Sequence, residues 1–137
     1  MAHSMTIKYL GDLRTENTHL KSGNVVITDA PTDHNGSGEA FSPTDLLCTS
    51  LAACALTLMG IAANNHAIKM GSVKAEITKV MGIEPRRVVE IIINYSFGKE
   101  NSYTEKEKKI LENSARTCPV AKSLNPEIKQ NITFKYE

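Results

Sequence analysis

Three stretches in the second half of the chain alternate between apolar and polar residues, at 72–81, 87–97 and 128–136. Alternation with a period of two is typical of a strand with one covered face. A turn at 82–85 separates the first two stretches, which predicts an antiparallel hairpin. On its covered face we expect Val73, Ala75, Ile77 and Met81 from the first strand and Val89, Ile91, Ile93, Tyr95 and Phe97 from the second.

The longest apolar stretch lies in the middle of the chain and predicts a helix. Ser42 is a capping residue type, Pro43 suits the first helical position, and Asp45 places an acid in the first turn. The residues that follow, Leu46 to Ala63, are apolar or small on every side. Such a helix is buried on every side. One domain of 137 residues can hardly wrap it, so we expect a second chain to pack over it.

Shorter elements complete the pattern. Thr104 and Glu107 have the spacing of a capping box, which predicts a charged helix to about Ala115. Pro119 suits the first position of another short helix, which we expect to run through Leu124. Three short strands are expected before the central helix, at 7–10, 14–20 and 23–28, with a loop at 29–40. The order βββ-α-ββ-αα-β segregates strands from helices and predicts the α+β class.

Composition narrows the class of protein. We interpret residues 1–4 as a cloning remnant and 5–137 as a single domain. Sixteen Lys and Arg balance 15 Asp and Glu, and a net charge of +1 gives no support for nucleic-acid binding. The apolar region from Leu46 to Ile68 is too polar at its edges for a membrane span. The start of the chain lacks the pattern of a secretory signal, so we expect a cytoplasmic protein.

Three cysteines carry the candidate chemistry: Cys48, Cys54 and Cys118. Their odd number, without an export signal, excludes a disulfide-stapled secreted scaffold. Cys118 precedes Pro119 and falls at a helix N-cap, where backbone N–H groups and the helix dipole favour a thiolate; a plain cap is the alternative. Cys54 lies inside the central helix as a reactive thiol or a packed small hydrophobe. Cys48 lies off the face of Cys54, so we expect it in the core.

Cys54 and Cys118 could meet in space and form a reversible disulfide. Thiolate attack on a peroxide O–O bond gives a sulfenic acid, which a second thiol resolves. No metal is implied, because Cys-x-x-Cys is absent and His19, His34 and His66 have no mutual ligand spacing. The chain also lacks a Gly-x-Ser-x-Gly elbow and a phosphate-binding glycine motif. The residues therefore favour thiol chemistry without a bound cofactor.

Two motifs carry a resemblance: SPTDLL at residues 42–47, leading to SLAAC at 50–54, and CPVAK at 118–122. Together they resemble the OsmC/Ohr family of osmotically inducible and organic hydroperoxide resistance proteins. The resemblance covers nearly the whole chain after Met5, including the order of elements. It implies an OsmC-like α+β fold and an intertwined homodimer, with long central helices buried between two sheets.

The resemblance also implies an activity. The protein would be a peroxiredoxin-like, two-cysteine peroxidase of the oxidative stress response, acting on organic hydroperoxides. Cys54 would be the peroxidatic thiol and Cys118 the resolving thiol, at a site in the dimer interface. A small thiol or a lipoyl-type dithiol would restore the reduced enzyme. The expected partners are thus a second copy, a hydroperoxide and a thiol reductant, with no nucleic acid and no membrane.

The best-studied branches of that family also use an arginine from the first hairpin and a glutamate at the start of the central helix. Arg14 fits the arginine, which would steady the thiolate. Ten residues before Cys54 stands Thr44 instead of the glutamate, and the adjacent carboxylate of Asp45 points about 100° round the helix. Either residue would orient the partners of Cys54. Other carboxylates that could stand in are Glu16 and Glu39.

Two other functions stay open. A non-catalytic OsmC-like dimer could bind a small hydrophobic ligand in an apolar interface pocket. The missing glutamate favours that hypothesis, whereas the retained pair of Cys54 and Cys118 favours the enzyme. A general disulfide oxidoreductase is the third hypothesis, and the absence of Cys-x-x-Cys argues against it.

Overall fold

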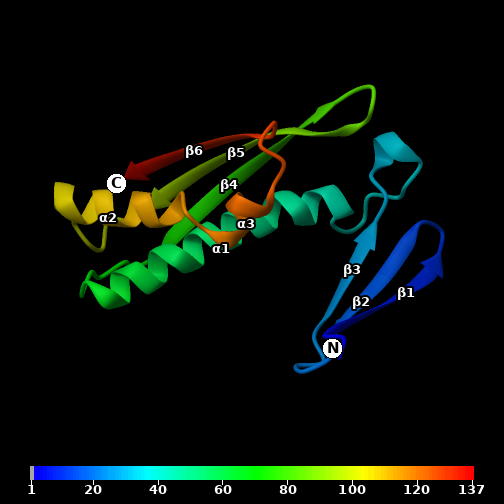
Figure 1. Cartoon of the computed structure of the whole chain (residues 1–137), viewed down its shortest axis with the longest axis horizontal. Coiled ribbons are helices and arrows are strands. Elements are labelled where there is room, and N and C mark those ends of the chain that lie inside the picture. The colour runs from blue at the N-terminus through cyan, green and yellow to red at the C-terminus, as the bar shows by residue number, and fades with distance from the viewer. Residues whose placement is uncertain (1) are drawn as a thin grey trace. The chain divides into compact units, whose positions relative to one another are not determined.

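The computed structural model describes residues 2–137, which form two compact units, 2–46 and 47–137. Its elements, labelled in Figure 1, are β1 (Met5–Gly11), β2 (Arg14–His19), β3 (Val25–Asp29), the 3₁₀ helix η1 (Thr32–His34), α1 (Pro43–Asn65), β4 (Val73–Gly82), β5 (Arg87–Phe97), α2 (Glu105–Ala115), α3 (Pro119–Ser123) and β6 (Lys129–Tyr136). The α+β class and the order βββ-α-ββ-αα-β are confirmed, and the predicted loop at 29–40 contains η1. The single domain over 5–137 stays a prediction.

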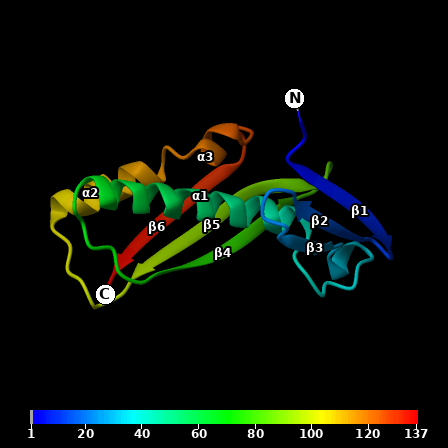
Figure 2. The same ribbon diagram turned by 90° about the horizontal axis from the view of Figure 1, so that it is seen from below.

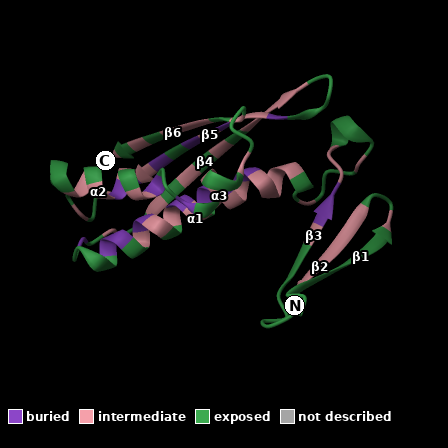
Figure 3. Ribbon diagram, in the orientation of Figure 1, coloured by how far each residue is buried: buried purple, intermediate pink, exposed green. Residues whose placement is uncertain are grey.

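The first unit is an antiparallel sheet in the order β1-β2-β3. Its register places Arg14 directly opposite Asp29, so these two side chains lie on the same face. The other face carries apolar side chains that solvent reaches, and most of this unit is exposed or half-buried in Figure 3. Those side chains are Met5, Ile7, Tyr9 and Val26, with exposed fractions of 69, 68, 65 and 45%.

The second unit contains a sheet in the order β4-β5-β6. The predicted hairpin is confirmed, with β4 and β5 antiparallel and Val73 opposite Phe97. The β6 strand runs parallel to β5, with Phe134 beside Tyr95. A parallel neighbour needs a crossover connection, which α2 and α3 supply. All three helices of this unit pack on one face of the sheet, as Figures 1 and 2 show from two sides.

A β-bulge changes which residue of β5 is buried near the start of the strand. Val80 pairs with Glu90, whereas the next residue, Met81, pairs with Val88. Val89 therefore falls between two pairs, and the alternation shifts by one residue. Val88 is 6% exposed and belongs to the core, so the prediction that Val89 lies on the covered face is wrong. The predicted core positions further along β5 are confirmed as buried: Ile91, Ile93, Tyr95 and Phe97.

The core of the second unit forms between α1, α2 and the sheet. Leu111 and Ala115 of α2 pack into the same cluster as the apolar face of β5. Within one chain α1 is buried along one side only, because Ala53 and Thr57 are exposed and Ile61 is 49% exposed. The second chain expected over α1 stays a prediction. The buried residues of α1 are Cys48, Leu51, Ala52, Ala55, Met59, Ala62 and Ala63.

By length and composition alone, α1 could cross a membrane. Its most apolar window of 18 residues has a mean hydropathy of 2.0. The core helix of a globular protein meets the same criterion. The residues that α1 buries against β5 and α2 agree with the predicted core helix.

The three predicted helix starts are present. Ser42 Oγ accepts a hydrogen bond from the Asp45 N–H at 3.1 Å, and the Ser42 N–H donates to Asp45 Oδ2 at 2.9 Å. Thr104 and Glu107 form the predicted capping box, with distances of 3.1 and 2.9 Å. Cys118 is the N-cap residue of α3. Each cap satisfies backbone N–H groups that have no partner inside the helix.

Candidate functional site

Two cysteines that are distant in sequence come together in the second unit. Cys54 lies midway along α1 and is half-buried, whereas Cys118 is fully buried at the start of α3. Their side chains are close enough to hydrogen-bond, and both thiols are free. The structure therefore brings the two thiols into contact, and their catalytic roles stay predictions.

Burial dominates the chemistry of Cys118. It raises the pKa of the thiol above its ordinary value, and the neighbouring Cys54 raises it further. The backbone N–H groups of Ala121, which lies 3.4 Å from Sγ, and of Val120 act in the opposite direction with a smaller effect. The N-cap N–H groups therefore act in the predicted direction, but burial outweighs them, so the prediction that this setting favours a thiolate at Cys118 is wrong in its net result. The reason is that a helix of five residues has few aligned peptide dipoles to offset the loss of water.

The two thiols differ in a way that suits two steps of one reaction. Cys118 stays protonated near neutral pH, because its pKa is raised, and its S–H can donate a hydrogen bond to the sulfur of Cys54. Cys54 is the more accessible of the two sulfurs. Reaction with a dissolved molecule requires access, whereas closure of a disulfide requires only that the second sulfur lie nearby. The pair can therefore react with an oxidant at Cys54 and close at Cys118.

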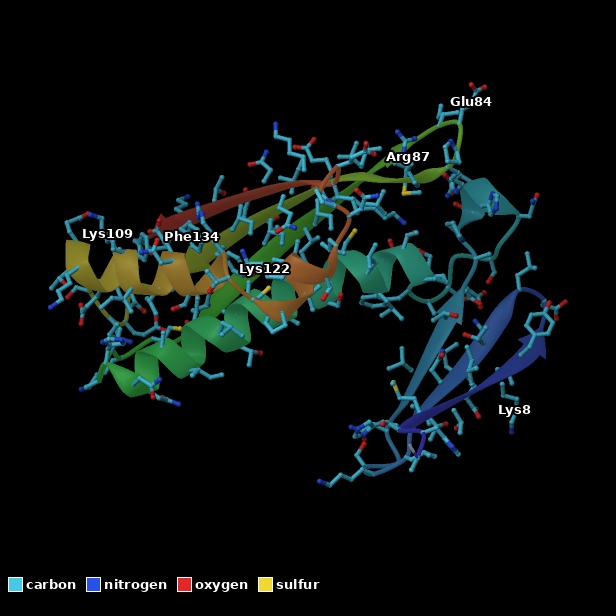
Figure 4. All side chains as sticks on the ribbon, in the orientation of Figure 1. Lys8, Glu84, Arg87, Lys109, Lys122 and Phe134 are labelled. Atoms are coloured by element: carbon cyan, nitrogen blue, oxygen red, sulfur yellow. The ribbon has the colours of Figure 1, made fainter. Side chains whose placement is uncertain are left out.

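Tyr95 adjoins the thiol pair from β5. Its hydroxyl donates a hydrogen bond of 2.8 Å to the backbone oxygen of Ala52, two residues before Cys54. The side chain is fully buried and stacks on Phe134, labelled on β6 in Figure 4, with ring centroids 5.6 Å apart. Burial raises the pKa of Tyr95, and the charges of Cys118 and Cys54 raise it further, so the phenol stays neutral. The sequence indicates only a core position here.

The third cysteine lies on α1, before Cys54. Cys48 is 2% exposed and packs in the core cluster of the second unit, as predicted. Among residues 2–137, no three His, Cys, Asp or Glu side chains are grouped so that they could hold a metal ion.

Arg14 lies in the first unit, in an ion-pair network at the start of β2. Its Nε and Nη2 donate to the two carboxylate oxygens of Asp29, each at 2.8 Å, and Nη2 also donates to Glu39 Oε2 at 3.3 Å. Asp29 is 1% exposed and accepts further hydrogen bonds from Ser37 Oγ at 3.2 Å and the Glu39 N–H at 3.1 Å. The bond to Arg14 lowers the pKa of Asp29 to about 2, and Asp29 in turn raises the pKa of Arg14.

The structure distinguishes the carboxylates considered for the missing glutamate. Glu39 contacts Arg14 directly, and its side chain is 72% exposed. Asp45 accepts from the Ser42 backbone in the cap of α1, and Thr44 Oγ1 lies 3.2 Å from Ser42 Oγ. These contacts of Thr44 and Asp45 serve the start of the helix. Among these stand-ins, Glu39 contacts Arg14 and does so beside Asp29.

The second unit combines a three-stranded sheet, a long apolar helix and two neighbouring free thiols. These features are those of a small α+β protein with a thiol site. The chain matches a family model of OsmC-like proteins over residues 36–133. It is also 49% identical to a protein from Psychrobacter arcticus 273-4 described as an osmotic stress induced and detoxification response protein. That likeness covers 98% of this chain and 96% of the other, with a TM-score of 0.93. The chain therefore belongs to the OsmC-like family, and the resemblance found in the sequence is confirmed.

More distant solved structures share the fold. An OsmC-like protein from Mycoplasma pneumoniae is 19% identical, with a TM-score of 0.79 over 99% of this chain and 97% of the other. An organic hydroperoxide resistance protein, OsmC, from Legionella pneumophila is 16% identical, with a TM-score of 0.71 over 98% of each chain. No curated protein sequence matched the chain.

Proposed function

We propose that this protein is a thiol-dependent peroxidase that reduces organic hydroperoxides. The observation that carries the proposal is the contact between an accessible thiol, Cys54, and a buried one, Cys118. Membership of the OsmC-like family supports it, as does the hydroperoxide resistance described for the Legionella pneumophila protein of the same fold. The reaction needs no bound cofactor, because external thiols supply the electrons.

The proposed reaction has two steps at the protein. Deprotonated Cys54 attacks the distal oxygen of R–O–O–H, so an S–O bond forms, the O–O bond breaks, and the alkoxide takes up a proton and leaves as alcohol. The Cys118 sulfur then attacks the Cys54 sulfur. The S–S bond forms, the S–O bond breaks, and the hydroxide leaves as water with the proton of Cys118. A small thiol or a lipoyl-type dithiol then reduces the disulfide.

Arg14 has a proposed part in the first step, which follows from the family resemblance. A guanidinium near a sulfur stabilises the thiolate over the thiol. Asp29 and Glu39 would set the direction of that guanidinium, because a bidentate pair fixes its plane. Thr44 and Asp45 keep the proposed supporting role at the start of α1.

A homodimer is part of the same proposal. Monomeric proteins rarely leave a large contiguous apolar surface open to water. In the single chain, Met5, Ile7 and Tyr9 lie together on one face of the first sheet, and each is more than half exposed. Ile61 of α1 is also open. A second copy of the chain would cover such surfaces, in agreement with the expected intertwined dimer.

A single-turnover oxidation tests the proposed activity. Fully reduced protein receives one equivalent of cumene hydroperoxide or of hydrogen peroxide, and free thiols and intact mass are followed over seconds. We expect loss of two thiols and two hydrogens, mapped to Cys54 and Cys118, with the organic peroxide reacting faster. If all three thiols survive both oxidants, the peroxidase proposal fails. Faster reaction with hydrogen peroxide would exclude the organic substrate class.

One observation favours a second candidate, a protein that binds a small hydrophobic ligand. The open face of the first sheet holds a hollow of about 420 Å³, lined in part by Met5, Ile7 and Val26. Its size and apolar walls would suit a small apolar molecule. Replacing Cys54 with Ser separates the two functions, because ligand binding would survive the change and peroxide turnover would not.

A further inference from the structure

The β5–β6 pair is a common support for the two helices that carry the reactive cysteines. Tyr95 on β5 and Phe134 on β6 are neighbours in the parallel register, and their rings stack. Gln130 lies four residues before Phe134 and therefore projects on the same face of the sheet. This face is the one on which α1 and α3 pack.

Each of these two strands holds one cysteine helix through a side-chain bond to its backbone. Tyr95 donates to the Ala52 oxygen at 2.8 Å and ties the turn of α1 that leads to Cys54. Gln130 Nε2 donates to the Ala121 oxygen at 3.1 Å and ties α3 three residues after Cys118.

The Ala121 residue links that second contact to the sulfur itself. Its carbonyl accepts from Gln130, and its N–H donates to Cys118 Sγ at 3.4 Å. On the other side, Tyr95 neighbours both thiols, and a charge on either sulfur would raise the pKa of its hydroxyl. The helices that carry the two sulfurs are therefore both anchored to the same pair of hydrogen-bonded strands, although these helices are more than fifty residues apart in sequence.

We propose that Tyr95 and Gln130 are positioning residues that hold Cys54 and Cys118 at the separation needed for disulfide closure. The backbone bonds fix the two helices relative to one sheet, so the sulfurs present a high effective concentration to each other. This inference rests on the proposed function for its use in catalysis, since only a closing pair benefits from it. Closure itself can be measured without any peroxide.

The experiment measures closure against glutathione. Oxidised glutathione converts the reduced pair to the intramolecular disulfide and is released as two molecules of reduced glutathione, so two electrons and two protons balance. Protein is equilibrated in glutathione buffers of graded ratio, quenched by alkylation, and mapped by peptide mass to Cys54 and Cys118. The result is an equilibrium constant for closure in each variant.

Two variants remove one bond each with little change of shape. Tyr95→Phe keeps the stacked ring and loses the hydroxyl, whereas Gln130→Met keeps the length and loses the amide. We expect each to lower the closure constant about 3- to 10-fold, which is the range for one hydrogen bond. The double variant should lie below both.

Matched controls remove similar bonds elsewhere in the same unit. Tyr136→Phe loses a hydroxyl bond to Glu112 Oε2 of 2.8 Å, and Tyr103→Phe loses one to the Met70 oxygen. Asn131→Leu loses an amide bond to Glu90 of 3.4 Å. We expect these three to close within about twofold of the wild-type chain, even where thermal unfolding shows an equal loss of stability.

The outcomes separate this inference from the proposed function. Closure constants of Tyr95→Phe and Gln130→Met equal to those of the controls would overturn it, as would a wild-type chain that never pairs Cys54 with Cys118. If Tyr95→Phe fails to fold, the result for Gln130→Met, a half-buried position, decides. If the wild-type chain closes with glutathione but ignores peroxides, the positioning role stands and the peroxidase proposal falls.

Discussion

The thiol pair and the Arg14 network are both clusters of reactive side chains, but they are built differently. Cys54 is half-buried and Cys118 is fully buried, with Tyr95 and backbone N–H groups among their polar neighbours. The Arg14 network is charged and partly open, with an arginine side chain that is 36% exposed against a carboxylate that is 1% exposed. The thiol pair provides two sulfurs in contact, and the Arg14 network provides a charged guanidinium held by carboxylates.

The difference shows what each cluster would need from elsewhere. Burial raises the pKa of Cys118, and the backbone N–H groups of Ala121 and Val120 act to lower it. Cys118 can close a disulfide from such a place, whereas attack on a peroxide requires a thiolate at Cys54. The family resemblance implies a cation that would favour that thiolate, and Arg14 is the residue it identifies.

The largest effect is expected from the two cysteines themselves. Cys54→Ser should abolish oxidation by cumene hydroperoxide, because the attacking sulfur is gone. Cys118→Ser should still lose the Cys54 thiol once, then stop at the sulfenic acid or proceed to the sulfinic acid, because no second thiol resolves it. Intact mass distinguishes these products from a disulfide.

Cys48→Ala is the matched control for that pair of variants, since Cys48 is buried at 2% exposure outside the pair. It should close Cys54 onto Cys118 like the wild-type chain. Full turnover by Cys54→Ser would contradict the assignment of the attacking thiol. Two-thiol loss in Cys118→Ser would show that Cys48 or a second chain resolves the intermediate.

Stability should respond differently in the two units. Leu111 is fully buried in the core of the second unit, so Leu111→Ala should lower the free energy of unfolding by about 2–5 kcal/mol in urea denaturation. Ile7 is 68% exposed in the single chain. Exposed positions usually change stability by about 0.5 kcal/mol or less.

The proposed homodimer changes the second expectation. If a second copy covers the open face of the first sheet, Ile7→Ala should cost more than about 0.5 kcal/mol, and its cost should depend on protein concentration. A cost below that value at every concentration would argue against cover of this face by a second copy. Sedimentation of the wild-type chain gives the independent control.

The sequence predicts the elements of this fold well because local signals specify them. The capping pairs Ser42 with Asp45 and Thr104 with Glu107, and the Cys118–Pro119 start of α3, all act within one helical turn. The parallel pairing of β6 with β5 depends on contacts far apart in sequence, and no local signal encodes it. The bulge that buries Val88 likewise exists only once two strands pair.

The sequence predicts the two cysteines of the candidate site but not the residues that neighbour them. Cys54 and Cys118 have a recognisable chemistry, whereas Tyr95 and Gln130 follow the ordinary alternation of a strand. The sequence predicts a loop from Asp29 onward, whereas Asp29 ends β3 opposite Arg14. The predicted direction of the Cys118 pKa shift is also wrong, because the shift is set by burial, and burial is a property of the folded chain.

A smaller effect is expected from Arg14. Arg14→Met should slow the first oxidation of Cys54 about 10- to 100-fold, which corresponds to loss of a cation that lowers the thiol pKa by about one to two units. Closure with glutathione at equilibrium should stay within about twofold of wild type, because the charge is not needed for geometry. Stopped-flow mixing with cumene hydroperoxide measures the rate, and the rates at several pH values show whether the thiolate fraction has changed.

Arg87→Met is the control for loss of an arginine. Arg87 lies at the tip of the β4–β5 hairpin, near the labelled Glu84 in Figure 4, and donates to the backbone oxygens of Ile83 and Pro85. In Arg87→Met, Cys54 should be oxidised at the wild-type rate. Equal rates for Arg14→Met and wild type would remove Arg14 from the proposed mechanism and leave the thiol pair without an assigned cation.

The smallest effect is expected from Asp29 and appears in the pH dependence of stability. Its pKa in the folded chain is about 2, below the ordinary value of 3.8, because Arg14 favours the charged carboxylate. A lowered pKa means that the stabilising contribution is complete above the ordinary value and is lost as the pH falls towards 2. Asp29→Asn removes that contribution, so its free energy of unfolding should change less than that of wild type between pH 4 and 2.

Glu100 gives this measurement its control in the second unit. Hydrogen bonds from Ser72 lower the pKa of Glu100 as well. Glu100→Gln should therefore also reduce the loss of unfolding free energy between pH 4 and 2, without affecting Arg14. Only Asp29→Asn should couple to Arg14→Met in a double-mutant cycle, because the two side chains share a bidentate bond. If the effects of Asp29→Asn and Arg14→Met on the free energy of unfolding at acid pH are additive, Arg14 is not anchored by Asp29. Glu39, which is open to solvent, would then be its main partner.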